Sequence, residues 1–512
     1  MSFAARLFFI FYCLITTLIA PLGLAFLCYK KRHDPPYGSR VGELLGRYRH
    51  KKSRSSSIWF HTVSVGEAIA ARPLIRTFIA QHPDLHVIVT TTTTTGAAEI
   101  EKITGAHHVY APLDCPLAVY SFLKKFNPSH LFIMETELWP CLLNLSSALG
   151  VRIAIFNARM PEKTCKKYCR YPRLTQDLIS KRIDLVISQS ADDQERFARI
   201  GIPAHKLVTT GSLKYDLTPN EELFHQALHY KQQWAQKILA PQNAPQSAPQ
   251  NAPQRAVQSE TTSAPQSAPQ SETTSDPQSA PQSASTSTPQ RATSAYGDSH
   301  ALPPASEITL SQVNTMSHQE LAVLGALSIH AGEEELIIES FYSLKVNYPN
   351  LRLVLVPRHQ TDTIKALNFL QSIKSTFQLR TETKPDLSDF TSDILIGNTM
   401  GEMEFYLGLC DMVFMGGSFV DVGGHNPLEP AYFSLPIITG PYYYNFAEQY
   451  DALIEQGGTL VANDHHRFVT VCQMFLDDKE KRTSVGMQAF EVQQLGCGSI
   501  KRTLAQLDRL LN

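Results

Sequence analysis

Short apolar runs alternate with longer amphipathic segments along most of this chain. The first pair is a strand-like run at 58–64 followed by a helix-like pattern at 67–82. Further strand-like runs follow at 86–94, 107–113, 129–137, 152–159, 184–190 and 206–212. Alternation of this kind predicts a doubly wound parallel sheet, with functional groups in the loops at the carboxyl ends of the strands.

A second series of the same kind begins near Leu321. It has a strand-like run at 321–329, a helix-like pattern at 333–347 and another strand-like run at 351–359. Three shorter apolar runs follow at 393–396, 411–415 and 435–439. The chain is therefore predicted to be an α/β protein with two Rossmann-like halves, and a cleft between such halves is a common ligand site.

Residues 397–446 combine glycine-rich turns with the starts of two predicted helices. Asn426 suits an N-cap, Pro427 suits the first helical turn, and the carboxylate of Glu429 suits the helix dipole. The glycines at 416, 417, 423 and 424 leave room for a ligand to approach the backbone. Strand, glycine turn and helix N-terminus together predict a phosphate site, although tight turns alone would also explain these glycines.

The amino terminus predicts a membrane anchor. Residues 7–29 form an uncharged apolar stretch of 23 residues, which at about 1.5 Å per residue spans the core of a bilayer. A cleaved signal peptide is the competing interpretation, but the run is too long and lacks a small-residue cleavage site. Basic residues at 30–32 and 40 follow it, against only Arg6 before it. The positive-inside rule then predicts a single-pass protein with its body in the cytoplasm.

Between the two halves, residues 240–306 consist of repeated Ala-Pro-Gln and Ser-Glu-Thr-Thr-Ser units. Such a segment buries too little apolar surface to offset its ordering entropy, so we expect it to be disordered. A partner-binding tail is the less favoured interpretation. The predicted domains are an anchor at 1–30, an N-terminal domain at 31–235, this insert at 240–306 and a C-terminal domain at 318–512.

Composition excludes some classes of function. Acidic and basic residues number 47 and 46, so no nucleic-acid partner is indicated. The nine cysteines are scattered, with Cys165 and Cys169 as the one close pair, which favours reduced thiols over a structural zinc site. No common signature for a phosphate-binding loop, zinc protease, serine hydrolase or dinucleotide fold is present.

Nine motifs carry a resemblance to a known family. They are HTVSVGEAIAARPLI (61–75), METELWP (134–140), FNARM (156–160), GSLKYD (211–216), HAGEEE (330–335), PRH (357–359), NTMGEM (398–403), GGSFVDVGGHNPLEPA (416–431) and GPYYYNF (440–446). In this order they resemble the transferases that move 3-deoxy-D-manno-octulosonic acid (Kdo) from CMP-Kdo onto a lipid A precursor. The resemblance implies an inner-membrane anchor and a GT-B fold, in which two Rossmann-like domains face each other across a cleft.

For the amino-terminal half, the resemblance implies the catalytic residues. Glu67 would be the general base, which must lie within hydrogen-bond reach of the acceptor hydroxyl. The alternative is a helix N-terminal carboxylate that only serves the dipole. On a strand, the side chains of Glu135 and Glu137 would point the same way, unless a turn intervenes. The resemblance favours Glu137 as a residue that assists the transition state. Lys214 would offset developing negative charge, or would be an exposed turn lysine.

For the carboxy-terminal half, the resemblance implies a site for CMP. Arg358 closes a predicted strand and can bind a phosphate or carboxylate. His330 would contact the donor or only a neighbouring turn, and Glu429 would accept from the ribose hydroxyls. The implied donor-binding residues are Pro357, Arg358, Met400, Gly401, Glu402, Asn426, Pro427, Leu428 and Glu429.

The predicted function is an inverting, metal-independent glycosyltransferase of the inner membrane that needs no cofactor. The sequence departs from the family pattern at Ser212, Ile329, Asn398 and in PEKTCKK (161–167), which puts details of the donor contacts in doubt. Two alternatives stay open at this point. One is another membrane-anchored GT-B enzyme with a different nucleotide sugar, and the other is a non-catalytic scaffold that recruits partners through the insert.

Overall fold

The structure, a computed structural model, describes residues 1–30, 38–49, 55–239 and 320–512. The amino-terminal half contains a seven-stranded sheet with strand order β3-β2-β1-β4-β5-β6-β7, and every neighbouring pair is parallel. Its strands are β1 (Ser57–His61), β2 (His86–Thr91), β3 (Ala106–Tyr110), β4 (Pro128–Met134), β5 (Arg152–Ala158), β6 (Leu185–Ser188) and β7 (Leu207–Thr209).

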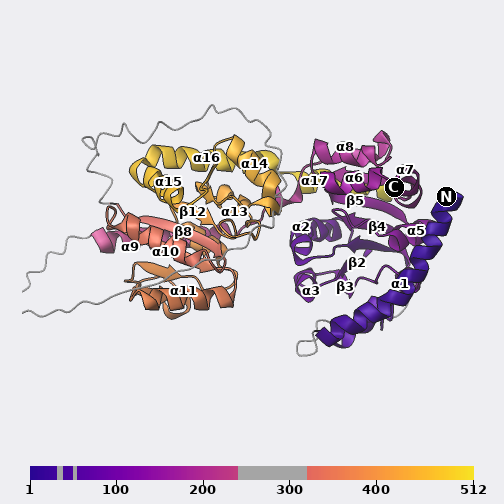
Figure 1. The fold of residues 1–512 in the computed structure, drawn as a ribbon, viewed down its shortest axis with the longest axis horizontal. Coiled ribbons are helices and arrows are strands. Elements are labelled where there is room, and N and C mark those ends of the chain that lie inside the picture. Colours follow the sequence, from indigo (N-terminus) through magenta and orange to yellow (C-terminus); the bar gives the residue numbers. More distant parts are fainter. Residues whose placement is uncertain (31–37, 50–54, 240–319) are drawn as a thin grey trace, which may run out of the picture. The chain divides into compact units, whose positions relative to one another are not determined.

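Helices pack on both faces of this sheet (Figure 1). They are α2 (Val65–Gln81), α3 (Thr94–Ile100), α4 (Pro116–Phe126), α5 (Pro140–Ala148), α6 (Glu162–Cys169), α7 (Pro172–Leu178) and α8 (Ala191–Arg199), with short 3-10 turns η1 (Gly38–Leu45), η2 (Ser180–Arg182), η3 (Ala204–Lys206) and η4 (Leu213–Tyr215). Along β1, Trp59 points into one core cluster while Ile58 and Phe60 point into the other. Both faces are therefore buried, which explains why the strands contain almost no charged residues.

The carboxy-terminal half repeats this architecture. Its seven strands follow the order β10-β11-β9-β8-β12-β13-β14, again all parallel. They are β8 (Ala322–Ile329), β9 (Leu351–Pro357), β10 (Phe377–Leu379), β11 (Ile394–Ile396), β12 (Met412–Met415), β13 (Ile437–Thr439) and β14 (Thr459–Val461). Its helices are α10 (Glu334–Lys345), α11 (Gln360–Ser372), α12 (Met403–Leu409), α13 (Leu428–Tyr432), α14 (Ala447–Glu455), α15 (His465–Asp477) and α16 (Lys479–Gly496), with 3-10 turns η6 (Arg380–Glu382) and η7 (Tyr444–Phe446).

These two doubly wound sheets confirm the predicted α/β class with two Rossmann-like halves. Two helices pack on the half opposite to the one that their position in the chain suggests. Helix α9 (Glu221–Leu239) packs on α12, and Phe224 stacks on Phe433 with ring centroids 3.9 Å apart. Helix α17 (Ser499–Leu511) packs on α2 and β5 and buries Leu504 and Leu507 in the amino-terminal core. The domain bounds at 235 and 318 stay a prediction.

The predicted apolar segment forms α1 (Phe3–Lys30), with Pro21 inside it. By length and composition, Phe3–Phe26 could cross a membrane. Helix α1 also contacts α4 and α7 of the amino-terminal half, beside which it lies in Figure 1. The predicted disordered insert, 240–306, lies outside the described residues.

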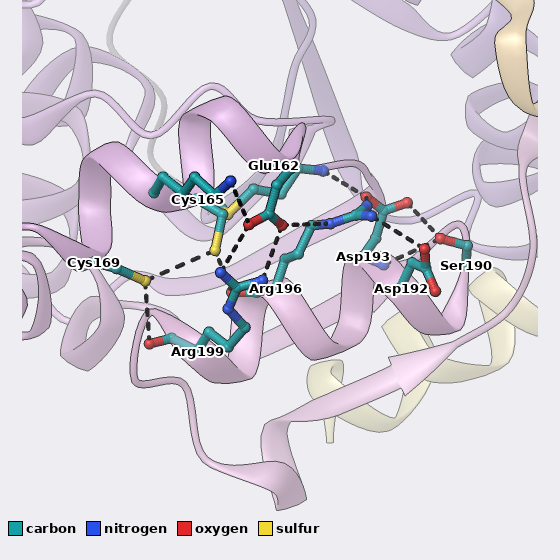
Figure 2. Close-up of polar contacts among 10 residues, drawn as sticks. Glu162, Cys165, Cys169, Ser190, Asp192, Asp193, Arg196 and Arg199 are labelled. Atoms are coloured by element: carbon teal, nitrogen blue, oxygen red, sulfur yellow. Dashed lines mark hydrogen bonds and ion pairs between the residues drawn. The ribbon is translucent and has the colours of Figure 1, made fainter. Parts of the chain in front are cut away.

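A polar network fixes the loop after β5, where the sequence departs from the family pattern (Figure 2). Asp193 accepts a hydrogen bond from the backbone of Met160 at 2.8 Å and caps α8 together with Ser190. Glu162 on α6 accepts two hydrogen bonds from Arg199 on α8, each 2.9 Å long. The loop that follows FNARM is thereby tied to α8 through backbone and side chain.

The Cys165 and Cys169 sulfur atoms lie 3.8 Å apart on α6 and are not bonded (Figure 2). All nine cysteines are free thiols in the structure. Burial raises the pKa of the Cys165 thiol to about 11, which keeps it protonated and unreactive at neutral pH. The reduced state of these thiols in the cell stays a prediction.

Candidate active site

Glu67 lies in the first turn of α2, directly after the loop that leaves β1. Its carboxylate accepts hydrogen bonds from the backbone of Val63 at 2.9 Å and from the Ser64 hydroxyl at 2.9 Å. Ser64 in turn accepts from the backbone of Glu67, so the pair forms a capping box at the helix start. The helix-dipole role considered from the sequence is therefore real. It does not exclude catalysis, because Oε2 receives one hydrogen bond and keeps a lone pair free.

The environment of Glu67 favours a protonatable carboxylate. The residue is only 9% exposed, and burial raises its pKa from 4.5 to about 7. The charges of Glu135 and Glu137 raise the pKa further, while the hydrogen bonds from Val63 and Ser64 lower it. A carboxylate whose pKa lies near neutral pH can accept a proton in the reaction and release it afterwards.

Glu135 and Glu137 lie in a turn and not on a strand. Strand β4 ends at Met134, and Glu135 has a left-handed backbone with φ of +58°. The alternative that a turn interrupts the strand therefore holds, and strand alternation does not apply to these two side chains. The turn, which the sequence left open, brings both carboxylates close enough to Glu67 to raise its pKa. Burial also raises the pKa of Glu137, and Glu135 adds to this effect.

Lys214 belongs to the same site. It lies on η4 and is not an exposed turn lysine, because burial lowers its pKa while the nearby carboxylate of Glu135 opposes that shift. The Asn157 side chain holds the turn by accepting a hydrogen bond from the backbone of Leu213 at 2.9 Å. The charges of Glu67, Glu135 and Glu137 therefore interact at the carboxyl edge of one sheet, and Lys214 interacts with Glu135.

His61 is a polar residue of this region that the sequence analysis missed. It ends β1 and is fully buried, and burial lowers its pKa to about 3, so the ring is neutral. Its Nδ1 lies 2.8 Å from the Thr90 hydroxyl, and its Nε2 has no hydrogen-bond partner within the part of the chain that the structure describes. Its position directly before the Glu67 loop was readable from the sequence, but its burial was not.

In the carboxy-terminal half, Glu333 organises the predicted phosphate turn. Its fully buried carboxylate accepts backbone hydrogen bonds from Gly417, Ser418 and Phe419 at 2.7 to 3.0 Å, and from His330 at 2.9 Å. No signal in HAGEEE distinguishes this glutamate from its two neighbours. A buried carboxylate with four such donors fixes the loop after β12 against the loop after β8.

The glycines of this turn serve protein packing. A Cβ atom at Gly416 would lie 2.5 Å from the Ser328 carbonyl oxygen, and one at Gly423 would lie 2.5 Å from the Tyr444 ring. Gly401 differs, because its φ is +78° and a Cβ there would meet nothing within 4 Å. Open backbone of the kind that a ligand can approach is therefore found at Gly401.

Residues of the predicted donor site meet around Glu429. Helix α13 begins at Leu428 with Pro427 as its N-cap, so the prediction of Asn426 as N-cap is wrong by one residue. The Asn426 side chain still accepts from the backbone of Leu428 at 3.2 Å and donates to Glu429 at 3.2 Å. Burial raises the pKa of Glu429, and the positive charge of Arg358 opposes this shift.

In the NTMGEM motif, Met400 and the backbone of Gly401 are accessible to a ligand, whereas the Glu402 carboxylate is paired with another side chain. Met400 is 94% exposed. Glu402 forms an ion pair with Arg380 at 3.3 Å, and Arg380 lies over the Phe405 ring at 4.1 Å. The Glu402 carboxylate therefore has a structural partner already. Pro357 ends β9 and is followed by the exposed Arg358, whose backbone donates to Ile329 at 2.8 Å.

Three histidines cluster beside Arg358. The Nε2 atoms of His330 and His425 lie 2.8 Å apart, and burial lowers the pKa of His425 to about 4. His330, His359 and the buried Asp362 each offer a ligand atom within 4.8 Å of the others, so among the described residues these three could hold a metal ion. The contact of His330 with a donor stays a prediction. The alternative, a contact with a neighbouring turn, is present, because the His330 ring lies 2.8 Å from that of His425 in the loop before α13.

Known proteins are similar in sequence to this chain over nearly its whole length. Residues 39–217 match the family described as 3-deoxy-D-manno-octulosonic-acid transferase. A protein of that name from Haemophilus influenzae is 28% identical over 498 residues, covering 96% of each chain. Another of that name from Bordetella pertussis is 25% identical and covers 89% of this chain and 87% of its own. A plant protein from Arabidopsis thaliana, named a probable mitochondrial member, is 26% identical and covers 86% of this chain and 81% of its own.

Among solved structures, the C-terminal CMP-Kdo binding domain of the WaaA protein from Acinetobacter baumannii is 27% identical. It covers 34% of this chain and 89% of its own, with a TM-score of 0.31. The family match and the relatives together span both sheets and the residues gathered around Glu67 and Glu429. Over this span the chain is similar to the 3-deoxy-D-manno-octulosonic-acid transferases, and its two parallel seven-stranded sheets fit an α/β GT-B fold.

Proposed function

We propose that this protein is the glycosyltransferase that moves Kdo from CMP-Kdo onto a lipid A precursor in lipopolysaccharide biosynthesis. The family supports a Kdo nucleotide as donor and a lipid A precursor as acceptor. The observation that carries the proposal is the buried Glu67, whose pKa of about 7 suits a general base beside two further acids and a lysine.

In the proposed reaction, the acceptor hydroxyl attacks the anomeric carbon of Kdo from the face opposite the CMP group. Glu67 takes the hydroxyl proton on the oxygen atom that keeps a free lone pair. The bond between the anomeric carbon and the phosphate oxygen breaks, and CMP leaves with the electron pair. One bond forms and one breaks on opposite faces of the sugar, which inverts the configuration.

The remaining residues of the site stabilise charge. Lys214 supplies a half-buried ammonium for the negative charge that develops on the sugar carboxylate or phosphate. Glu137 lies beside Glu67 and assists by keeping the pKa of the base high. On the donor side, Arg358 binds phosphate or carboxylate, Glu429 accepts from ribose hydroxyls, and Pro357, Met400–Glu402 and Asn426–Leu428 complete the CMP site.

Helix α1 anchors the protein at the inner membrane, with the catalytic body on the cytoplasmic face. Because Tyr12 and Leu24 contact the amino-terminal half, α1 lies with one face on that half and its exposed apolar face toward lipid, in place of the single-pass span expected from the sequence. The support is the apolar length of Phe3–Phe26 and the basic residues that follow at 30–32. This placement brings a membrane-bound acceptor and a water-soluble donor to the same molecule.

One experiment tests the function directly. Purified full-length protein is incubated with CMP-Kdo, generated in place, and a tetraacylated lipid A precursor, and the lipid is analysed by mass spectrometry. The expected result is a mass gain that corresponds to one or more Kdo residues. An unchanged lipid mass would overturn the proposal, and inhibition by UDP but not by CMP would point to another nucleotide sugar.

A further inference from the structure

Helix α1 is fastened to the amino-terminal half at both ends of its apolar stretch. Near its start, the Tyr12 hydroxyl donates to Asp114 at 2.7 Å, and the sulfur atoms of Cys13 and Cys141 lie 3.7 Å apart. Near its end, Leu24 is buried in a small cluster with Leu44, Ala97 and Tyr110. The helix therefore spans the surface between two fixed points.

A cavity lies under the stretch of α1 between these points. Its volume is about 520 Å³, within the range of small-molecule sites. From α1 it is lined by Ile19, Ala20 and Gly23, and from the body by Leu113, Thr92 and Trp139 among others. A Cβ atom added at Gly23 would meet nothing within 4 Å, so the helix is not packed on the body at this position.

The lining is suited to hydrocarbon. Most of it is aliphatic or aromatic, and its one carboxylate, Asp114, is already satisfied. Asp114 accepts hydrogen bonds from Tyr12 and from the backbones of Cys141 and Leu142 at 2.7 to 3.1 Å. A polar ligand would find few free partners here, whereas an apolar chain would lose nothing by entering.

Two hydrogen bonds link the wall of the cavity to the loop that holds the proposed catalytic base. The Thr92 hydroxyl, which lines the cavity, donates to the carbonyl of Val63 at 2.9 Å. The amide of the same Val63 donates to Glu67 at 2.9 Å. The outer side is formed by α1, whose exposed apolar side chains suit a lipid surface. The cavity thus connects a membrane-facing helix with the loop that holds Glu67.

We propose that this cavity binds one acyl chain of the lipid acceptor and so places the sugar headgroup at Glu67. The proposal rests on the proposed function, since it needs a lipid acceptor. Continuity with the apolar surface of α1 favours a chain that enters from the bilayer over a soluble apolar ligand. Helix α1 is then part of the acceptor site as well as an anchor.

The proposal is tested by a substitution at Gly23 that places a larger side chain in the cavity. A Cβ atom added at Gly23, which lines the cavity, meets no protein atom within 4 Å, so Gly23→Leu starts its side chain in open space. Each methylene group displaced from an apolar site lowers affinity about fourfold. We expect KM for a tetraacylated lipid A precursor to rise at least tenfold, with kcat and CMP affinity unchanged. Ala25→Leu is the matched control, because Ala25 is exposed on α1 and does not line the cavity.

The outcomes separate this proposal from the proposed function. Wild-type protein that transfers no Kdo would overturn the function itself. Active wild-type protein with an unchanged KM in Gly23→Leu would overturn the acyl-chain site alone. If Gly23→Leu also loses CMP affinity, Ala20→Leu fills the same cavity from the neighbouring turn. A rise in KM in Ala20→Leu with normal CMP affinity supports the site, and a normal KM overturns it.

Discussion

The pKa of Glu67 makes a quantitative prediction about the pH dependence of the reaction. Burial and the charges of Glu135 and Glu137 raise that pKa from 4.5 to about 7, roughly 2.5 pH units. At about 1.4 kcal/mol per unit, the folded protein disfavours the ionised form by about 3.5 kcal/mol. The base is active only when ionised, so kcat/KM should rise with pH up to about 7 and then level off.

The magnitude follows from the fraction of Glu67 that is ionised. One unit below the pKa, at about pH 6, roughly a tenth of the protein has an ionised base, so kcat/KM should fall about tenfold from its plateau. The assay is initial-rate Kdo transfer at subsaturating acceptor between pH 5 and 9, with CMP binding measured across the same range as a control for donor affinity.

Neighbouring charges provide a second part of the same test. Glu135→Gln removes a negative charge that raises the pKa of Glu67, so the acidic limb should move to lower pH. A profile that is flat from pH 5 to 9, or whose limb lies near 4.5, would refute the reasoning. So would a limb that stays in place in Glu135→Gln.

The same shift has a consequence for stability. A carboxyl group whose pKa is raised on folding stabilises the protein fully below its unfolded pKa of about 4.5, and this contribution is lost as pH rises through about 7. Glu67→Gln cannot ionise, and glutamine is also found in capping boxes. Between about pH 4.5 and 7, wild-type protein should therefore lose free energy of unfolding relative to Glu67→Gln and then level off, as measured by urea denaturation.

Three further predictions concern other residues. Lys214→Ala should lower kcat about 100-fold and leave CMP affinity unchanged in a binding titration, because its charge acts on the transition state. Arg358→Ala should weaken CMP-Kdo binding about 10- to 100-fold by losing a charged hydrogen bond, whereas the exposed Lys365→Ala on α11 should bind normally. Glu333→Gln should lower the free energy of unfolding by about 2 kcal/mol or more in urea denaturation, because its amide nitrogen cannot accept from the loop at 417–419; an unchanged stability would contradict its structural role.

The sheets were predictable from the sequence because burial on both faces leaves a strong signal. Trp59 and Phe60 point to opposite faces of the same sheet, and both are fully buried, so the run is apolar without a break. The packing of α17 was not predictable. Leu504 and Leu507 give an amphipathic pattern, but the pattern does not say which half of the chain covers it.

The sequence motifs predicted which residues belong to the candidate site, but not how those residues are buried or which neighbours they contact. The spacing of Ser64 and Glu67 is that of a capping box, yet the sequence does not show that the carboxylate is buried beside two other acids. The left-handed backbone of Glu135 depends on its surroundings and not on its residue type. Glu333 contacts a loop more than 80 residues away, a pairing that local sequence cannot reveal.

The central claim is that Glu67 removes the proton from the acceptor hydroxyl, and Glu67→Gln tests it most directly. The variant keeps the size of the side chain and one acceptor oxygen for the helix cap, but its amide cannot take a proton at neutral pH. Kdo transfer to the tetraacylated precursor, followed by mass spectrometry, should fall at least 100-fold in Glu67→Gln, while CMP binding stays close to wild type and the variant remains folded at the assay temperature by thermal unfolding. Turnover within a few-fold of wild type would contradict the account.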